Sequence, residues 1–153
     1  LKRMGLISRN GGTMRLMLAG RSDNGTTINA SRLTYKYLVK RRAQVFEYQK
    51  QCLHMKMLVI DDACYVGSAN MDPRSLYLNL EIMIRIESAE LAAHLRTLFD
   101  GMVEDAEPQT AAVIKARSGP FTWVRQAVSY LIVGVLDYSV TRSLAIPLPK
   151  PKG

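Results

Sequence analysis

The segment HMKMLVIDDACYVGSAN, residues 54–70, decides most of what the sequence says about this 153-residue chain. It contains the pattern H-x-K-x4-D-x5-G-S-x-N, in which His54, Lys56, Ser68 and Asn70 supply an imidazole, an ammonium, a hydroxyl and a carboxamide. Lysine attracts a phosphate oxygen, serine and asparagine donate hydrogen bonds to it, and histidine acts as a nucleophile or general acid near neutral pH. The pattern predicts phosphoryl chemistry that needs no metal ion and no other cofactor.

A β-hairpin is predicted to carry these residues. Residues 53–60 and 63–66 are apolar runs on either side of a two-residue acidic turn, which is typical of two antiparallel strands. Because side chains alternate along a strand, the imidazole and the ammonium share one face, and so do the hydroxyl and the carboxamide. Gly67 leaves room for a close backbone approach. The hairpin can therefore carry four polar groups to one pocket.

These residues resemble the HKD motif of the phospholipase D superfamily. The continuation NMDPRSLYLNLE, residues 70–81, resembles the second, C-terminal half of bacterial cardiolipin synthases. Upstream, MRLMLAGRSD at 14–23 resembles the strand and loop that precede the motif there, and VFEYQ at 45–49 resembles the segment just before it. The likeness covers residues 10–106 and, more weakly, the tail.

The resemblance implies a mechanism that uses two histidines. In the family, two HKD motifs meet at a pseudo-twofold interface; one histidine attacks the phosphodiester and forms a phosphohistidine. The other protonates the leaving alcohol and then deprotonates the incoming one. By analogy with the C-terminal half, His54 would be the acid and base. The pattern occurs once and residues 1–53 contain no histidine, so a second HKD half would have to supply the nucleophile.

The resemblance also assigns the remaining site residues. Lys56, Ser68 and Asn70 would bind the phosphate. Asp61 belongs to the motif and is more often structural in the family. Glu81 matches the carboxylate that orients the histidine, an arrangement general to activated imidazoles.

The expected architecture is α/β: a phospholipase D-like α-β-α sandwich with a mixed sheet, one HKD half and a C-terminal helical tail. Four segments are expected in order: the half-domain at 1–106, a connector rich in Pro and Gly at 107–120, an amphipathic helical tail at 121–145 and a disordered end at 146–153. Periodicity predicts strands at 14–19, 44–48 and 81–86, a helix at 27–42 and a second helix capped by Ser88. His94 falls on that second helix as a surface or packing residue.

Charge is unevenly distributed along the chain. Residues 1–50 hold eleven Lys or Arg and two acidic residues, a net of +9, whereas residues 51–153 have a net of −1. A basic half favours an anionic partner: a membrane surface, a phospholipid headgroup or nucleic acid. A solvated helix face is the alternative explanation, because runs of charge often serve only solubility.

The tail and the cysteines bear on location. The uncharged run at 126–136 is eleven residues long, and a membrane-spanning helix needs about 20. The tail helix either packs on the domain or lies in the membrane interface, using Trp123, Tyr130 and Tyr138. Cys52 and Cys64 are expected to be buried, reduced thiols. Nothing at the N-terminus resembles a signal peptide. The expected location is peripheral, on the cytoplasmic face of the bacterial inner membrane.

Three functional hypotheses follow. The first is a phosphatidyltransferase half of the cardiolipin synthase type, acting on an anionic phospholipid, phosphatidylglycerol, at a membrane surface. The second is a homodimeric, metal-independent endonuclease of the same superfamily, in which two copies complete the site and the basic half binds DNA phosphates. The third is a truncated half that folds but catalyses nothing.

Overall fold

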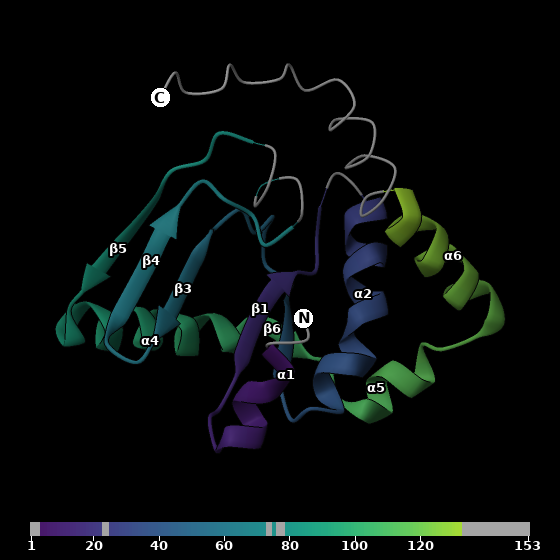
Figure 1. Ribbon diagram of the computed structural model, residues 1–153. Helices are drawn as coiled ribbons and strands as arrows, with labels where there is room; N and C mark the ends of the chain where they lie inside the picture. Colours follow the sequence, from purple (N-terminus) through teal and green to yellow (C-terminus); the bar gives the residue numbers. More distant parts are fainter. Residues whose placement is uncertain (1–3, 23–24, 73–74, 76–78, 133–153) are drawn as a thin grey trace, which may run out of the picture.

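The computed structural model describes residues 4–22, 25–72, 75 and 79–132 (Figure 1). The elements along the chain are α1 (Met4–Ile7), the 3-10 turn η1 (Ser8–Asn10), β1 (Arg15–Ala19), α2 (Gly25–Val39), β2 (Gln44–Tyr48), β3 (Met57–Ile60), β4 (Ala63–Gly67), β5 (Met83–Glu87), α4 (Ala89–Glu104), β6 (Ala106–Pro108), α5 (Ala111–Ala116) and α6 (Pro120–Leu131).

The described strands form two three-stranded sheets. In the first, β2 lies between β1, which is parallel to it, and β6, which is antiparallel. In the second, β3, β4 and β5 follow one another as an antiparallel meander. The helix α2 connects β1 to β2, since parallel neighbours need a crossover connection. The sequence predicts a mixed sheet; the first sheet is mixed, and the β3–β4 hairpin belongs to the second.

Helices cover both faces of the first sheet. The helix α2 contacts β2, α5 and α6, whereas α4 lies behind both sheets in Figure 1 and contacts β2, β3, β4 and β6. Phe46 on β2 and Phe99 on α4 meet edge to face, with ring centroids 6.1 Å apart. The predicted α-β-α architecture with a C-terminal helix is confirmed.

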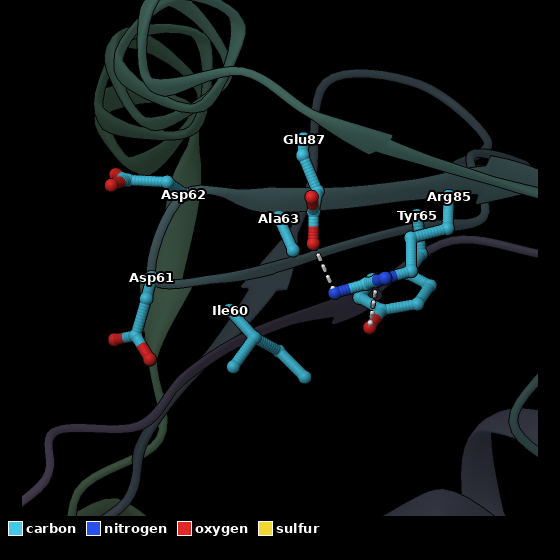
Figure 2. Close-up of a pocket in the computed structure, with 7 residues that line it drawn as sticks. All are labelled: Ile60, Asp61, Asp62, Ala63, Tyr65, Arg85 and Glu87. Carbon is cyan, nitrogen blue, oxygen red and sulfur yellow. Dashed lines mark hydrogen bonds and ion pairs between the residues drawn. The ribbon is translucent and has the colours of Figure 1, made fainter.

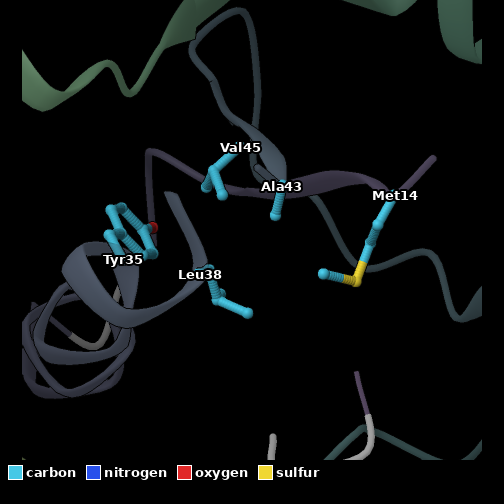
Figure 3. Packing of buried hydrophobic residues seen from close by; sticks show 5 residues of the cluster. All are labelled: Met14, Tyr35, Leu38, Ala43 and Val45. Atoms are coloured by element: carbon cyan, nitrogen blue, oxygen red, sulfur yellow. The ribbon is translucent and has the colours of Figure 1, made fainter. Parts of the chain in front are cut away.

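The hydrophobic core lies between α2 and the first sheet. Its buried members are Met14, Tyr35, Leu38, Ala43 and Val45, which face one another in Figure 3. Each core residue comes from β1, α2, β2 or the segments next to them. The core therefore fixes the first sheet, on which α4 and the second sheet are built.

A buried carboxylate joins α2 to the segment after the first sheet. Glu47 on β2 is fully buried and accepts two hydrogen bonds from Arg32 on α2, at 2.7 and 2.8 Å. Arg117, at the end of α5, approaches the same carboxylate at 3.4 Å and binds Glu107 at 2.6 and 2.7 Å. Burial, followed by the charge of Glu47, raises the pKa of the neighbouring Tyr35. We call Arg32, Glu47, Glu107 and Arg117 the charge cluster.

Several predictions from the sequence agree with the structure. The strands β1, β2, β4 and β5 lie within a few residues of their predicted positions, and Ser88 caps α4 by accepting a hydrogen bond from the Leu91 amide at 3.2 Å. Cys64 is buried and His94 is exposed, both as predicted. The prediction for Cys52 is wrong, because this thiol is exposed in the loop before the hairpin.

Other segments differ from expectation. The strand predicted at 53–60 begins only at Met57. The segment predicted as a connector, 107–120, contains most of β6 and all of α5. The strand β6 forms because it pairs with the distant β2, and a short polar segment gives no local sign of such pairing. Within the predicted tail, α6 ends at Leu131; residues 133–145 and the predicted disordered end at 146–153 lie outside the described residues.

Candidate active site

The open end of the β3–β4 hairpin brings the predicted site residues together. His54 and Lys56 lie in the extended segment just before β3, and Ser68 follows β4 directly. The Gly67 amide donates a 3.3 Å hydrogen bond to the Lys56 carbonyl, so the pairing continues one step past the strands. Residues 56 and 67 are therefore neighbours across the hairpin, and His54 extends from the same end.

Close packing of β4 against β5 fixes the position of Ser68. A Cβ atom at Gly67 would lie 2.0 Å from the Ile82 carbonyl oxygen, a distance that no side chain can occupy. The Ser68 amide donates to that carbonyl at 3.0 Å, and the Ile82 amide donates to the Ser68 hydroxyl at 3.1 Å. Glycine is needed here for close approach rather than for a left-handed backbone.

The resulting geometry holds the Glu81 carboxylate beside Ser68. The Ser68 hydroxyl donates a short hydrogen bond to one carboxylate oxygen, and the Asn79 amide donates to the other at 3.2 Å. These hydrogen bonds lower the pKa of Glu81 below its ordinary value, first through Ser68, then Asn79 and Ser75, with the positive charge of Lys56 contributing. Glu81 is therefore an anion at neutral pH, and its oxygens help to orient the neighbouring donors.

The two basic residues are free to meet a ligand. The Lys56 ammonium donates to the His54 carbonyl at 3.0 Å, which holds it near the start of the hairpin. The His54 side chain is exposed, and its ring makes no hydrogen bond to any of the described residues. Asn70 is exposed in the loop that follows Ser68. The Glu81 carboxylate does not hydrogen-bond the His54 ring here, so the orienting role implied for it stays a prediction.

Asp61 lies at the opposite end of the hairpin. It occupies the turn between β3 and β4 in the left-handed region, with φ of 49°, which aspartate tolerates better than most residues. It lies five positions along the chain from Lys56, about 16 Å at a rise of roughly 3.3 Å per position in an extended segment. Its carbonyl accepts a hydrogen bond from Arg96 on α4. The structure does not bring Asp61 to the other site residues.

A shallow open pocket of about 460 Å³ marks that distant end. Figure 2 shows Asp61 and Asp62 at one side and, across from them, the ion pair between Arg85 and Glu87. Arg85 also donates to the Tyr65 hydroxyl at 3.1 Å. The lining has three acidic side chains and one basic side chain, and it lies a hairpin's length from His54, so this pocket is separate from the candidate site.

The sequence analysis did not assign Asn79 or Ser75 a role in the site. Asn79 bonds Glu81, and the Ser75 side chain also helps to lower the pKa of Glu81. Ser75 is buried, and its amide donates to the Asp72 side chain at 2.8 Å. The available signal is the spacing of Asn79 and Glu81: residues two apart in an extended segment share a face. Residues 73–74 and 76–78 lie outside the described residues.

Comparisons with known proteins identify the family. Residues 1–103 match the family described as cardiolipin synthase, PLD-like domain. Cardiolipin synthase B of Escherichia coli K12 is 39% identical over 97 residues, which cover 63% of this chain and 24% of that protein. The probable cardiolipin synthase YwiE of Bacillus subtilis is 32% identical over 124 residues, 80% of this chain and 25% of that protein. The minor cardiolipin synthase ClsB of the same organism is 27% identical over 128 residues, 81% of this chain and 32% of that protein.

The family model and the α-β-α fold together define the class. The chain belongs to the phospholipase D superfamily, within the family of cardiolipin synthase PLD-like domains. It spans about a quarter of the length of the first two relatives described above.

Replacing Glu81 with Gln tests the carboxylate. The substitution keeps the shape but removes the charge, so Ser68 and Asn79 lose a charge-assisted acceptor. In an enzyme that contains this segment together with a second HKD half, we expect turnover to fall roughly 10- to 100-fold, the worth of one or two hydrogen bonds to a charged group. Because the pKa of Glu81 is lowered, the carboxylate stays ionised below the pH at which imidazole titrates. The acid limb of the pH–rate profile should therefore persist in the variant.

Glu87→Gln is the matched control. Glu87 is the last residue of β5, at the end of that strand far from Glu81, and it pairs with Arg85. It should leave the pH–rate profile and kcat close to those of the parent. Equal losses for the two variants would show that the carboxylate near Ser68 has no special part in turnover.

Proposed function

We propose that this chain supplies one half of a phosphatidyltransferase that makes cardiolipin from two phosphatidylglycerol molecules. The observation that carries the proposal is the grouping of His54, Lys56 and Ser68 at one end of a hairpin, beside an ionised Glu81. The relatives that carry the name cardiolipin synthase support the choice of a lipid phosphodiester as substrate.

The first chemical step breaks the link to the leaving alcohol. A histidine of a second HKD half attacks phosphorus, so that a P–N bond forms and the P–O bond to glycerol breaks. His54, protonated, gives its proton to the leaving alkoxide, which departs as glycerol. Lys56 stabilises the negative charge that grows on the phosphate oxygens in this step. Ser68 donates its single hydroxyl proton to Glu81 in the structure, so it contributes only by turning that proton from Glu81 to the phosphate.

The second step runs in reverse with a new alcohol. Neutral His54 takes the proton from a hydroxyl of a second phosphatidylglycerol, whose oxygen attacks the phosphohistidine. The new P–O bond gives cardiolipin, the P–N bond breaks, and His54 is protonated again. One imidazole thus alternates between the roles of acid and base.

One histidine does not suffice for this cycle. The nucleophile and the leaving-group acid act on opposite sides of the same phosphorus, and His94, the only other histidine, lies on α4 away from the hairpin end. The proposal therefore includes a second HKD half, either from the rest of a longer protein or from a second copy. A second copy requires an isologous contact that places two His54 rings face to face.

A chimaera tests the proposal. The segment of E. coli cardiolipin synthase B that matches this chain is replaced by the corresponding residues here, and cardiolipin formation from phosphatidylglycerol is measured in detergent micelles. We expect activity in the chimaera, insensitivity to EDTA because protein cations neutralise the phosphate, and no activity from the 153-residue chain when sedimentation shows a monomer.

Three results would contradict the proposal. A folded chimaera without activity would show that these site residues do not support the reaction. Loss of activity with EDTA and rescue by a divalent ion would contradict neutralisation by protein groups. A dimer of the chain that cleaves DNA and ignores phosphatidylglycerol would favour the nuclease.

A further inference from the structure

The helix α6 exposes its apolar side chains to solvent and turns its polar side chains toward the protein. It packs along α2, and its less exposed positions on that side are Thr122, Gln126 and the buried Ser129. Large apolar side chains point away from the protein instead: Phe121 is 90% exposed and Trp123 63% exposed. A helix on the surface of a globular protein normally buries its apolar side.

The exposed apolar residues form one continuous face. Phe121, Val124, Val128 and Leu131 recur at intervals of three and four, so they lie on the same side of α6. The exposed fraction is 50% or more for each of them. Trp123 and Tyr130, also exposed, lie together at one border of this side, where an aromatic ring with a polar atom can meet both apolar and aqueous surroundings. We call these six residues the α6 face.

Charge near the α6 face favours an anionic partner. The helix contains no acidic residue, and its single charged side chain is the exposed Arg125. Lys115, in the last turn of the preceding α5, is exposed as well. A protein partner could cover the apolar side chains equally well. The positive charges of Arg125 and Lys115 add a preference for a surface that carries distributed negative charge, and anionic lipids provide one.

We propose that the α6 face docks on an anionic phospholipid bilayer and lies in its interface, parallel to the surface. The described helices include none long and apolar enough to cross a membrane, and α6 is about 18 Å long at 1.5 Å per residue. The apolar side chains enter the acyl boundary while Thr122, Gln126 and Ser129 stay against α2. Only one charge lies on α6, so the docking energy comes mainly from burial of these apolar side chains.

The position of α6 relates this surface to the candidate site. In Figure 1 the C-terminal end of α6, the N-terminal end of α2 and the arrowhead of β4 all lie at the upper end of the molecule. Ser68 follows that arrowhead directly. The axis of α6 runs down the side of α2 that faces away from β4 in Figure 1, so a bilayer parallel to α6 lies against that side of the molecule. The docking itself does not depend on the proposed chemistry.

The chain contains a single tryptophan, and it belongs to the α6 face. Trp123 fluorescence is therefore a native probe that needs no label. The full 153-residue chain is titrated with vesicles of phosphatidylglycerol and phosphatidylethanolamine, and in parallel with vesicles of phosphatidylcholine alone. We expect a blue shift of the emission and quenching by lipids brominated on their acyl chains, both stronger with the anionic vesicles.

Two double variants separate the α6 face from general stickiness. Phe121→Ser with Val128→Ser removes two apolar groups from the α6 face, and vesicle flotation should show binding about tenfold weaker or more. Ile60→Ser with Leu98→Ser removes two exposed apolar groups from β3 and α4 and should bind as the parent does. All four side chains are exposed, so circular dichroism should show both variants folded.

The outcomes distinguish this proposal from its competitors. Trp123 emission that ignores anionic vesicles, or equal binding by the two double variants, would overturn it. A lipid-free dimer that the α6 variant alone abolishes, together with no vesicle binding, would assign the α6 face to a second copy of the chain. His54→Ala should leave vesicle binding unchanged, so a failure of docking and a failure of the proposed chemistry are seen separately.

Discussion

Replacing His54 with Ala in the active chimaera should lower phosphatidyl transfer by about 10⁴-fold, the upper range for loss of a general acid and base. The imidazole would serve both half-reactions, so its removal affects glycerol release and attack by the second alcohol alike. The Lys56 ammonium donates to the His54 carbonyl and the Ser68 hydroxyl donates to Glu81, so neither of them replaces the imidazole. The measurement is cardiolipin formed from phosphatidylglycerol under single-turnover and steady-state conditions.

His94→Ala is the control that the chain itself provides. Both histidines are exposed, but His94 lies on α4 and makes no part of the hairpin end. Its replacement should leave turnover within about twofold of the parent, as expected for a surface site. Because His54 is exposed, neither variant should change the unfolding temperature. Near-normal turnover in folded His54→Ala, or a large loss in His94→Ala, would remove His54 from the mechanism.

The second large effect concerns stability and comes from the charge cluster. Replacing Arg32 with Met should lower the free energy of unfolding by about 3 kcal/mol, because it leaves a fully buried carboxylate without its two shortest hydrogen bonds. Arg117 remains at 3.4 Å and compensates only in part. Urea denaturation followed by circular dichroism measures the change.

Two further variants sharpen this prediction. Arg32→Met combined with Glu47→Leu should recover much of the lost stability, since replacing both members of a buried pair is often nearly neutral. Lys50→Met is the surface control: the Lys50 ammonium lies 2.8 Å from the Asp105 carboxylate, the two side chains are 64% and 38% exposed, and the loss should be much smaller than for Arg32→Met. Equal losses for Arg32→Met and Lys50→Met would show that burial of Glu47 carries no penalty.

The pH dependence of this effect has a definite sign. The hydrogen bonds to Glu47, partly offset by burial, raise the pKa of Arg32 above its ordinary value. A raised pKa contributes stability that is fully present below the pKa of the unfolded chain and is lost only above it. The Arg32 contribution should therefore be constant across the neutral range, and the stability difference between parent and Arg32→Met should not shrink between about pH 6 and pH 9.

Local patterns in the sequence predicted those helices and strands that depend on interactions between neighbouring residues. The apolar run before Asp61 predicts the first strand of the hairpin, and Ser88 predicts the start of α4, because a strand's alternation and a helix cap are short-range effects. The spacing of His54, Lys56 and Ser68 likewise predicts their grouping, since a hairpin brings its open end together whatever surrounds it.

Long-range packing decided the rest. Glu47 is an ordinary strand residue in the sequence, and it becomes a buried anion only because Arg32 and Arg117, 15 and 70 residues away, converge on it. The division of the strands into two sheets, and the strand β6 within the predicted connector, likewise depend on pairing between distant segments.

Packing against α2 also determines which side of α6 faces outward. The sequence of α6 is amphipathic, but it does not determine whether the apolar side or the polar side packs against the rest of the protein. In the folded chain α2 takes the side with Thr122, Gln126 and Ser129, which leaves the larger apolar side chains in solvent. Sequence alone thus determined which residues meet at the hairpin end, whereas tertiary contacts decided which surfaces remain exposed, because burial depends on what packs against each face.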